Sequence, residues 1–300
     1  MKKAILFYNP NSGGRTMPSK IDFIIEKFQL RNVLIQPVRL TQNFEQVVEN
    51  VLNNNSYDYA VIAGGDGTLN GTVNIILKHT PSLPIGLIPA GTSNDFCRCL
   101  EIPNSIEKAV NIILNDNLTK VDVGLINNSH YFLSTCSGGM FVDVSFNTDS
   151  ELKKNFGPVA YYLKALSKAV SIKSFPIRIK TDTLEIDEEI ILFLILNGKH
   201  AAGFNNIDED ADIADGIMNI LVVKNCSPID LANMFFKVLS HKNLTDQYVT
   251  KIRAKKCTIS CDTQIDLSVD GEQWNVFPKK VEFIKKHLNV FVPSQKKQGE

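Results

Sequence analysis

The sequence lacks both a long hydrophobic run and a net charge. Its longest strongly apolar stretch is IILFLIL at 190–196, whereas a helix needs about 20 apolar residues to span a bilayer. Lysine and arginine total 32, as do aspartate and glutamate, so no overall positive field gathers nucleic acid. We therefore expect neither an integral membrane protein nor a nucleic-acid binder.

Cysteine pairs, repeats and targeting signals are also missing. The six cysteines form no CxxC pair and have no histidine at zinc-like spacing, which predicts reduced thiols in a cytoplasmic protein. The N-terminus MKKAILFYNP has no small-residue cleavage site, so a signal peptide is not expected. A chain of 300 residues without low-complexity tracts is long enough for two folded domains.

The first 125 residues alternate short apolar runs with helical patterns. Strands are expected at 4–9, 32–40, 59–64 and 84–89, and helices near 19–28, 44–52, 69–77 and 106–114. Such βα repetition predicts an open, mostly parallel sheet with helices on both faces.

From about residue 120 closely spaced strands replace the βα pattern. Strands are expected at 120–127, 130–138, 175–182, 188–198, 216–224, 255–262, 265–274 and 289–293, with helices at 159–170 and 229–239. This pattern predicts a mainly antiparallel, sandwich-like second domain. We expect domains at 1–125 and 126–293, a final strand that packs back on the first domain, and a frayed tail at 294–300.

The segment GGDGT at 64–68 joins an expected strand to an expected helix. Backbone N–H groups and the helix dipole can face an anion there, although the lysine of a P-loop is absent. Thr68 can cap the helix or donate to a phosphate. Asp66 beside phosphates requires an intervening cation such as Mg²⁺ or a hydroxyl donor. A plain βα turn is the simpler alternative, but three glycines around one aspartate argue against it.

Two further turns have the same position in the βα pattern. NPNSGG at 9–14 follows the first strand, and IPAGTSNDF at 88–96 includes the end of the strand at 84–89. In an open α/β sheet the loops after neighbouring parallel strands line one crevice. The three turns are therefore expected to form one anion-binding site.

NPNSGG, GGDGTLN and PAGTSNDFCRCL together resemble the soluble bacterial diacylglycerol kinase family, which is related to sphingosine and ceramide kinases and more distantly to NAD kinases and phosphofructokinases. GGDGT alone marks the superfamily, whereas the PxGTxNDxxR pattern favours the lipid branch. SVDGEQW at 268–274 and DIADGIMNILVV at 212–223 resemble two further family elements. The resemblance covers about residues 1–293, with the motifs in order.

The resemblance implies an ATP-dependent lipid kinase with an NAD kinase-like first domain. Its most direct expectation is the conversion of diacylglycerol to phosphatidic acid. The implied nucleotide-binding residues are Asn9, Ser12, Gly13, Thr41, Gly64, Gly65, Asp66, Gly67, Thr68, Leu69, Asn70 and Thr92.

The resemblance also implies the catalytic residues. Glu272 corresponds to the family's general base, and a carboxylate is suited to accept the proton of a lipid hydroxyl. Asp66 and Asp95 are implied to place Mg²⁺ at the phosphates, because phosphoryl transfer depends on positioning and charge neutralisation. Alone, the Asp-Gly pair would indicate only a type I′ hairpin, and Asp270 is the alternative base.

A second, structural Mg²⁺ site is implied in the strand domain. Its ligands would be the Asp215 side chain and the carbonyls of Asp212 and Ile217, since hard cations prefer oxygen. A solvated acidic run is the alternative. The segment before the element at 212–223 lacks the proline that the family often has there. The residues after Thr41 also lack the family's glycine-acidic pattern. Because of these departures, the sequence predicts the phosphoryl-transfer chemistry better than it predicts which lipid is the acceptor.

A lipid substrate implies peripheral contact with the inner membrane face. Two basic clusters are candidates: Lys251, Arg253, Lys255 and Lys256, and Lys279, Lys280, Lys285 and Lys286. Because total charge is balanced, solvated strand faces are the simpler interpretation. A homodimer is left open. The alternative functions are an NAD kinase-like enzyme and a catalytically inactive nucleotide-binding regulatory protein.

Overall fold

The computed structural model describes residues 1–294 except 42, 141, 143–172, 202, 241–243 and 245. Two compact units divide the chain: unit 1 is Met1–Val121 with Lys286–Glu300, and unit 2 is Asp122–Lys285. The helix expected at 159–170 and the last six residues of the expected tail lie outside the described residues.

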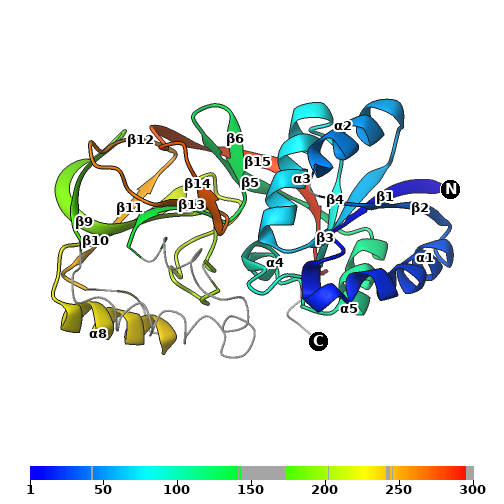
Figure 1. The fold of residues 1–300 in the computed structure, drawn as a ribbon, viewed down its shortest axis with the longest axis horizontal. Coiled ribbons are helices and arrows are strands. Elements are labelled where there is room, and N and C mark those ends of the chain that lie inside the picture. Colours follow the sequence, from blue (N-terminus) through cyan, green and yellow to red (C-terminus); the bar gives the residue numbers. More distant parts are fainter. Residues whose placement is uncertain are drawn as a thin grey trace. The chain divides into compact units, whose positions relative to one another are not determined.

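Unit 1 contains four neighbouring parallel strands (Figure 1). They are β1 (Lys2–Tyr8), β2 (Val33–Arg39), β3 (Tyr59–Gly64) and β4 (Ile85–Pro89), in the order β4-β3-β1-β2. Its helices are the short 3₁₀ turns η1 (Ser12–Arg15) and η2 (Met17–Lys20), and α1 (Ile21–Gln29), α2 (Phe44–Asn54), α3 (Asp66–His79), α4 (Asp95–Cys99) and α5 (Ile106–Leu114).

The central strands of unit 1 are apolar throughout because helices cover both faces of the sheet. Every residue of β3 and β4 is buried, as expected of strands covered on both sides. Figure 1 shows α1 and α5 along one face and α2 and α3 along the other. The Ser105 side chain begins α5 by accepting a hydrogen bond from the Lys108 amide. The predicted open parallel sheet is confirmed.

Unit 2 consists mainly of antiparallel strands. They are β5 (Leu118–Ile126), which starts in unit 1, and β6 (His130–Phe132), β7 (Thr135–Gly139), β8 (Phe175–Thr181), β9 (Glu185–Leu196), β10 (Met218–Lys224), β11 (Val249–Ala254), β12 (Lys256–Ser260), β13 (Leu267–Val269), β14 (Glu272–Trp274) and β15 (Lys280–Phe291), which ends in unit 1. The helix α8 (Pro228–Leu239) confirms the helix expected at 229–239.

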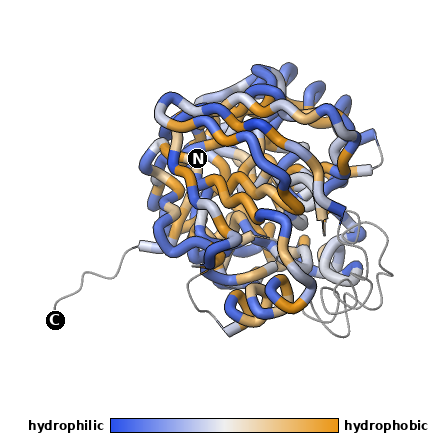
Figure 2. Tube along the Cα trace, turned by 90° about the vertical axis from the view of Figure 1, so that its left-hand side faces the viewer, coloured by the Kyte–Doolittle hydropathy of each residue, from blue (hydrophilic) through white to orange (hydrophobic). Residues whose placement is uncertain are grey.

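The long strand β9 joins the two parts of this strand arrangement. Residues 185–190 of β9 pair with β8, whereas residues 192–196 pair with β7, and β10 pairs with β9 along residues 190–196. Apolar residues of these strands, including Ile190 and Phe193, are buried in one core. Figure 2 shows hydrophobic residues along the inner strands and hydrophilic ones on many outer turns. The antiparallel, sandwich-like class predicted for this region is confirmed.

Several boundaries differ from the prediction. The strand expected at 130–138 is divided into β6 and β7 at Leu133 and Ser134. β15 begins at Lys280, nine residues before the strand expected at 289–293, and β11 was not predicted. These segments are rich in lysine and arginine, and only Ile252 of β11 is buried, so their apolar signal is weak.

β5 and β15 each contribute to both units, and they pair with each other. The division falls between Val121 and Asp122 in β5 and between Lys285 and Lys286 in β15. Lys286 has φ of 51° although it lies inside a strand. No helix among the described residues combines the length and apolar character that crossing a membrane requires. All six cysteines are free thiols, as predicted.

Candidate active site

The turns after β1, β3 and β4 meet at the carboxyl edge of the unit 1 sheet. The Asn9 amide donates to the carbonyl of Ala63 at 3.0 Å, and the Ala90 amide donates to the carbonyl of Gly64 at 2.9 Å. The Asn9 side chain also donates to the Thr68 hydroxyl oxygen at 3.0 Å. Each turn is thus bonded to its neighbour, and the three form one continuous backbone surface.

Small residues allow the turns to touch. A Cβ atom added at Gly91 would lie 2.5 Å from the Cα of Gly65, closer than real Cβ contacts occur. A Cβ atom at Gly13 would lie 3.3 Å from the carbonyl oxygen of Ala90. One glycine of each motif, Gly13, Gly65 and Gly91, therefore allows backbone to pack closely against backbone.

The first turn of α3 has backbone N–H groups that the helix itself does not bond. α3 begins at Asp66, and its N-cap Gly65 provides no side-chain cap, so the first N–H groups have no partner within the helix. Thr68 lies inside α3 and is not its cap. Its oxygen accepts from Asn9, which leaves the hydroxyl proton available to donate. The edge is suited to an anion.

Two residues of the same turn lie inward. Leu69 is 1% exposed and Asn70 is 7% exposed. The Asn74 side chain donates to the backbone carbonyl of Asn70 at 2.9 Å and to its side-chain oxygen at 3.2 Å. Both residues therefore support the turn from behind.

The third turn is held by Asn94, which was not among the predicted site residues. Asn94 has φ of 51° and precedes α4. Its side-chain oxygen accepts from the Gly91 amide at 2.8 Å, and its side-chain nitrogen donates to the Gly91 carbonyl at 2.9 Å. Asparagine tolerates this left-handed conformation, so the N of GTSND fixes the loop that carries Thr92.

Two carboxylates stand at the starts of α3 and α4. Asp95 is 7% exposed, and the Arg98 guanidinium donates to it at 3.3 Å. Asp66 begins α3, and its charge acts on the neighbouring thiol of Cys97: burial first, then Asp66, raise the pKa of Cys97. The structure therefore brings Asp66 and the helix that begins with Asp95 into one region.

The remaining predicted nucleotide residues of unit 1 lie on this edge. Thr41 follows β2 and is exposed, and the preceding Leu40 amide donates to the Tyr8 carbonyl at 2.9 Å. Ser12 is half-buried in the first turn, and Thr92 is exposed in the third. All three are thus near the carboxyl ends of the strands.

In unit 2 the DGE element is the hairpin between β13 and β14. Val269 pairs with Glu272, and the two turn residues Asp270 and Gly271 have φ of 48° and 83°. Positive φ at both positions is the type I′ geometry. Glu272 is exposed at the start of the edge strand β14.

Asp270 is buried, and its carboxylate is engaged in the structure. Its oxygens accept from the amides of Leu133 at 2.7 Å, Ser134 at 2.7 Å and Thr135 at 2.9 Å. These amides lie at the break between β6 and β7, so Asp270 stabilises the bend that divides the expected strand. This leaves Glu272 as the exposed carboxylate of the motif.

A buried polar network continues from this bend. The Asn197 side chain donates to the carbonyls of Leu133 at 2.7 Å and Asp122 at 2.9 Å. The Asp122 carboxylate in turn accepts from the Gly216 amide. The hairpin that carries Glu272 and the turn that contains Asp212 and Asp215 are therefore connected through buried hydrogen bonds.

In the turn that contains Asp212 and Asp215, the carboxylates accept hydrogen bonds from nearby amides and from a basic side chain. Asp212 accepts from the Ala214 amide at 2.9 Å. Asp215 accepts from the Ile217 amide at 2.8 Å and from Arg253 at 2.7 Å. Within the described ranges, no group of three or more histidine, cysteine, aspartate or glutamate residues is arranged to hold a metal ion.

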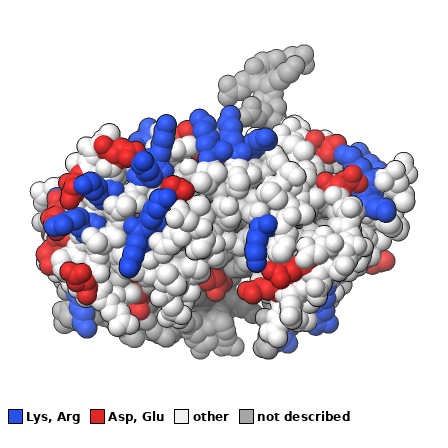
Figure 3. Space-filling view, turned by 90° about the horizontal axis from the view of Figure 1, so that it is seen from above, with Lys and Arg blue, Asp and Glu red and all other residues white. Residues whose placement is uncertain are grey.

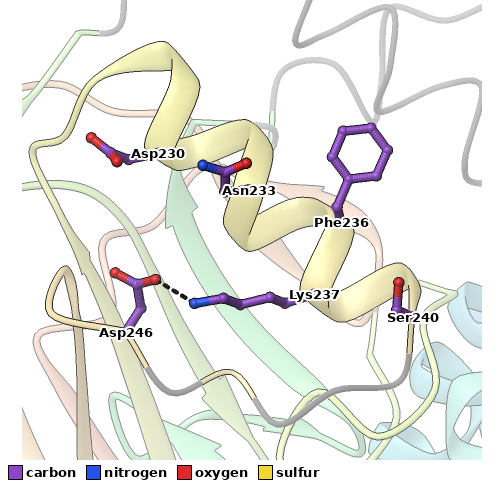
Figure 4. A pocket seen from close by; sticks show the side chains of 6 residues that line it. All are labelled: Asp230, Asn233, Phe236, Lys237, Ser240 and Asp246. Carbon is purple, nitrogen blue, oxygen red and sulfur yellow. Dashed lines mark hydrogen bonds and ion pairs between the residues drawn. The ribbon is translucent and has the colours of Figure 1, made fainter.

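A hollow of about 370 Å³ lies along α8 in unit 2 (Figure 4). It is lined by Asp230, Asn233, Phe236, Lys237, Ser240 and Asp246. Lys237 crosses it to form an ion pair with Asp246 at 2.7 Å. None of the predicted site residues lines it, and its lining residues are already paired or open to solvent.

Comparisons with known proteins agree with these motifs. Residues 3–126 match the diacylglycerol kinase catalytic domain, and residues 136–292 match the YegS C-terminal NAD kinase beta sandwich-like domain. A diacylglycerol kinase of Staphylococcus carnosus is 32% identical over 300 residues, covering 100% of this chain and 98% of the relative. One from Staphylococcus aureus is 32% identical over 295 residues, covering 98% and 93%.

A solved structure shares the fold. The crystal structure of a diacylglycerol kinase from Bacillus anthracis str. Sterne has a TM-score of 0.80 at 23% identity, and the alignment covers 97% of each chain. With two family domains in order and relatives matched over nearly their whole length, the chain belongs to the diacylglycerol kinase family of lipid kinases.

Proposed function

We propose that this ATP-dependent lipid kinase phosphorylates diacylglycerol to phosphatidic acid. In this proposal residues 1–125 bind the nucleotide, and residues 126–293 bind the lipid. The observation that carries it is the joined edge of unit 1, where glycine-packed turns and the uncapped start of α3 provide backbone donors for phosphates. The family relationship supplies the lipid class of the acceptor.

We assign the nucleotide to the turns of unit 1. Asn9, Ser12, Gly13 and Thr41 would bind from the first two strand ends, and the segment Gly64–Asn70 with Thr92 from the other two. The backbone N–H groups of Gly67 and Thr68 and the Thr68 hydroxyl would donate to phosphate oxygens. Leu69 and Asn70 act from inside α3, because both are buried.

Glu272 is the proposed general base. It would accept the proton of the lipid hydroxyl while the hydroxyl oxygen bonds to the γ-phosphorus and the bond from that phosphorus to the bridging oxygen of ATP breaks, releasing ADP. Its exposure supports this role, whereas the Asp270 carboxylate already accepts three backbone hydrogen bonds. Asp270 is therefore better explained as the support of the hairpin.

The residues of unit 1 fit Mg²⁺ bound with the nucleotide. Asp66 and Asp95 would supply oxygen ligands at the carboxyl edge of the sheet, which suits a hard cation; Asp95 also pairs with Arg98 at 3.3 Å. When bound, Mg²⁺ neutralises charge on the phosphates. The proposed work of these two carboxylates is to hold the cation beside the turn donors.

Replacing Glu272 tests this assignment. Glu272→Gln keeps the shape of the side chain but cannot accept the proton, and we expect kcat to fall at least 100-fold, in line with general base catalysis. ATP affinity and the melting temperature should stay at parent values, because Glu272 is exposed. Glu185→Gln, an exposed change on β9, is the matched control. Parent-like turnover by Glu272→Gln refutes the assignment.

The acceptor is tested by transfer of labelled phosphate from ATP. Mixed micelles containing diacylglycerol, phosphatidylglycerol, ceramide or sphingosine should give label mainly in phosphatidic acid. Label in NADP from added NAD would instead support an NAD kinase-like enzyme. Absence of transfer to every acceptor would support a regulatory protein that has lost catalysis.

The second Mg²⁺ site fits less well. The Asp215 carboxylate already accepts from Arg253 and from the Ile217 amide, so a cation bound by Asp215 with the carbonyls of Asp212 and Ile217 would compete with the guanidinium. If this turn binds Mg²⁺, Arg253→Ala should strengthen Mg²⁺-dependent stabilisation measured by thermal melting. If Mg²⁺ does not change the melting temperature of Arg253→Ala, the site is refuted.

Membrane contact is proposed to be peripheral, at the inner face of the membrane. Figure 3 shows lysine and arginine side chains interspersed with acidic ones, and Lys251 and Arg253 form ion pairs with Asp208 and Asp215. Lys255, Lys279 and Lys285 are therefore the better candidates. Sedimentation with anionic vesicles tests contact, and sizing chromatography tests the homodimer.

A further inference from the structure

The side chain of Trp274 lies on the same face of the hairpin as Glu272. Leu267 of β13 pairs with Trp274, and Val269 pairs with Glu272. Directly paired residues of antiparallel strands point to the same face, and residues two apart on a strand do so as well. Gln273, which lies between them and pairs with Ser268, points to the opposite face.

Trp274 lies at the rim of the unit 2 core. β14 ends the strand order within the described part of the sheet, and Trp274 packs half-buried against the core cluster that contains Leu267 and Val269. Glu272, two residues earlier, is exposed. The face therefore passes from packed core at Trp274 to open solvent at Glu272 over about 7 Å.

The indole is held by a second ring. His130 of β6 lies against it with ring centroids 4.3 Å apart and an interplanar angle of 38°. Burial lowers the pKa of His130, which favours the neutral form of the imidazole. The two rings pack against each other beside the exposed end of the hairpin.

The indole Nε1 is buried and has no hydrogen-bond acceptor among the described residues. Leaving such a buried donor without an acceptor is energetically unfavourable. Phenylalanine at this position would supply the same packing without that cost. A ligand with carbonyl groups explains the indole better, because a small movement of the ring would give its N–H an acceptor.

We propose that Trp274, supported by His130, is a specificity residue of the lipid acceptor site, a role that rests on the proposed function. The free hydroxyl of a diacylglycerol and its two ester groups are carried by the same glycerol unit. With the hydroxyl at Glu272, those ester groups lie over the indole, whose apolar ring and single N–H match C–H groups and carbonyl acceptors. Trp274 thus selects an ester lipid.

Kinetics of Trp274→Ala and Trp274→Phe test this role against a structural one. With short-chain diacylglycerol in mixed micelles, Trp274→Ala should raise the KM for the lipid at least tenfold, and Trp274→Phe should give an intermediate value. The KM for ATP should not change in either variant. Gln273→Ala, on the opposite face, is the matched control and should keep the parent KM for the lipid.

Fluorescence supplies a readout that does not depend on the variants. Trp274 is the single tryptophan of the chain, so its emission in the parent protein should change saturably when short-chain diacylglycerol is added to micelles, and not when micelles alone are added. A lipid KM within twofold of the parent value in both variants, or an unchanged emission, overturns the role of Trp274. Absence of transfer to diacylglycerol in the parent protein instead refutes the proposed function.

Discussion

Replacing Asp270 with asparagine should destabilise unit 2 strongly although the change removes only a charge. One carboxylate oxygen accepts from Ser134 and Thr135, and the other accepts from Leu133. Asparagine keeps one acceptor oxygen, and its side-chain NH₂ would face the Leu133 amide. That amide would then be a buried donor without an acceptor.

The magnitude follows from these bonds. Hydrogen bonds to a charged group contribute about 1.5–3 kcal/mol each, neutral ones about 1 kcal/mol, and an unsatisfied buried donor costs about 1–3 kcal/mol. Weakening two bonds and losing the third therefore predicts a loss of about 3–5 kcal/mol in the free energy of unfolding. Asparagine tolerates positive φ at this position, so backbone strain adds little.

Urea unfolding followed by the emission of Trp274 measures this loss, because the tryptophan lies in the same hairpin. Asp262→Asn, an exposed aspartate of unit 2, is the control and should stay within about 0.5 kcal/mol of the parent. A loss below about 1 kcal/mol for Asp270→Asn would show that the carboxylate does not hold the β6–β7 bend.

Two further results are expected. Gly91→Ala would place a Cβ atom 2.5 Å from the Cα of Gly65, so the third turn must shift. The KM for ATP should therefore rise at least tenfold. A parent-like KM for ATP would contradict the close packing of the three turns. Burial lowers the pKa of His130 and His287 below 6.5 in the folded protein. As the pH falls below about 6.5, the unfolded chain therefore binds more protons than the folded protein, and the free energy of unfolding should decrease. Melting temperatures at about pH 7.5 and 5.5 measure this decrease, which should be smaller in His130→Gln; equal melting temperatures would contradict it.

Local apolar patterns were enough to predict most of unit 1. The strand expected at 59–64 and the helix expected at 106–114 coincide with β3 and α5, because a fully buried run and a capped amphipathic run are each visible within a few residues. Convergence of the three turns follows from the parallel sheet, since neighbouring strands end at the same edge.

Long-range hydrogen bonds explain what was missed in unit 2. The break at Leu133 depends on a carboxylate 137 residues away along the chain, and no local pattern contains that partner. In unit 1, by contrast, the short helix α4 follows a local turn in which the Asn94 side chain bonds to Gly91. The ion pair of Arg253 with Asp215 joins a basic segment considered for membrane contact to an acidic segment considered for Mg²⁺ binding.

The path of β15 bears on how the chain is made. Unit 1 contains both ends of the chain, and β15 returns to it: Val290 pairs with Ile85, Phe291 packs edge-on against Tyr59, and Asn117 donates to the carbonyl of Val292. On the ribosome, unit 2 is one uninterrupted stretch and can fold as soon as it emerges. The proposed nucleotide edge is encoded first but must wait for β15, so a nascent chain released before residue 290 would carry all the proposed ATP-binding motifs on an unfinished unit.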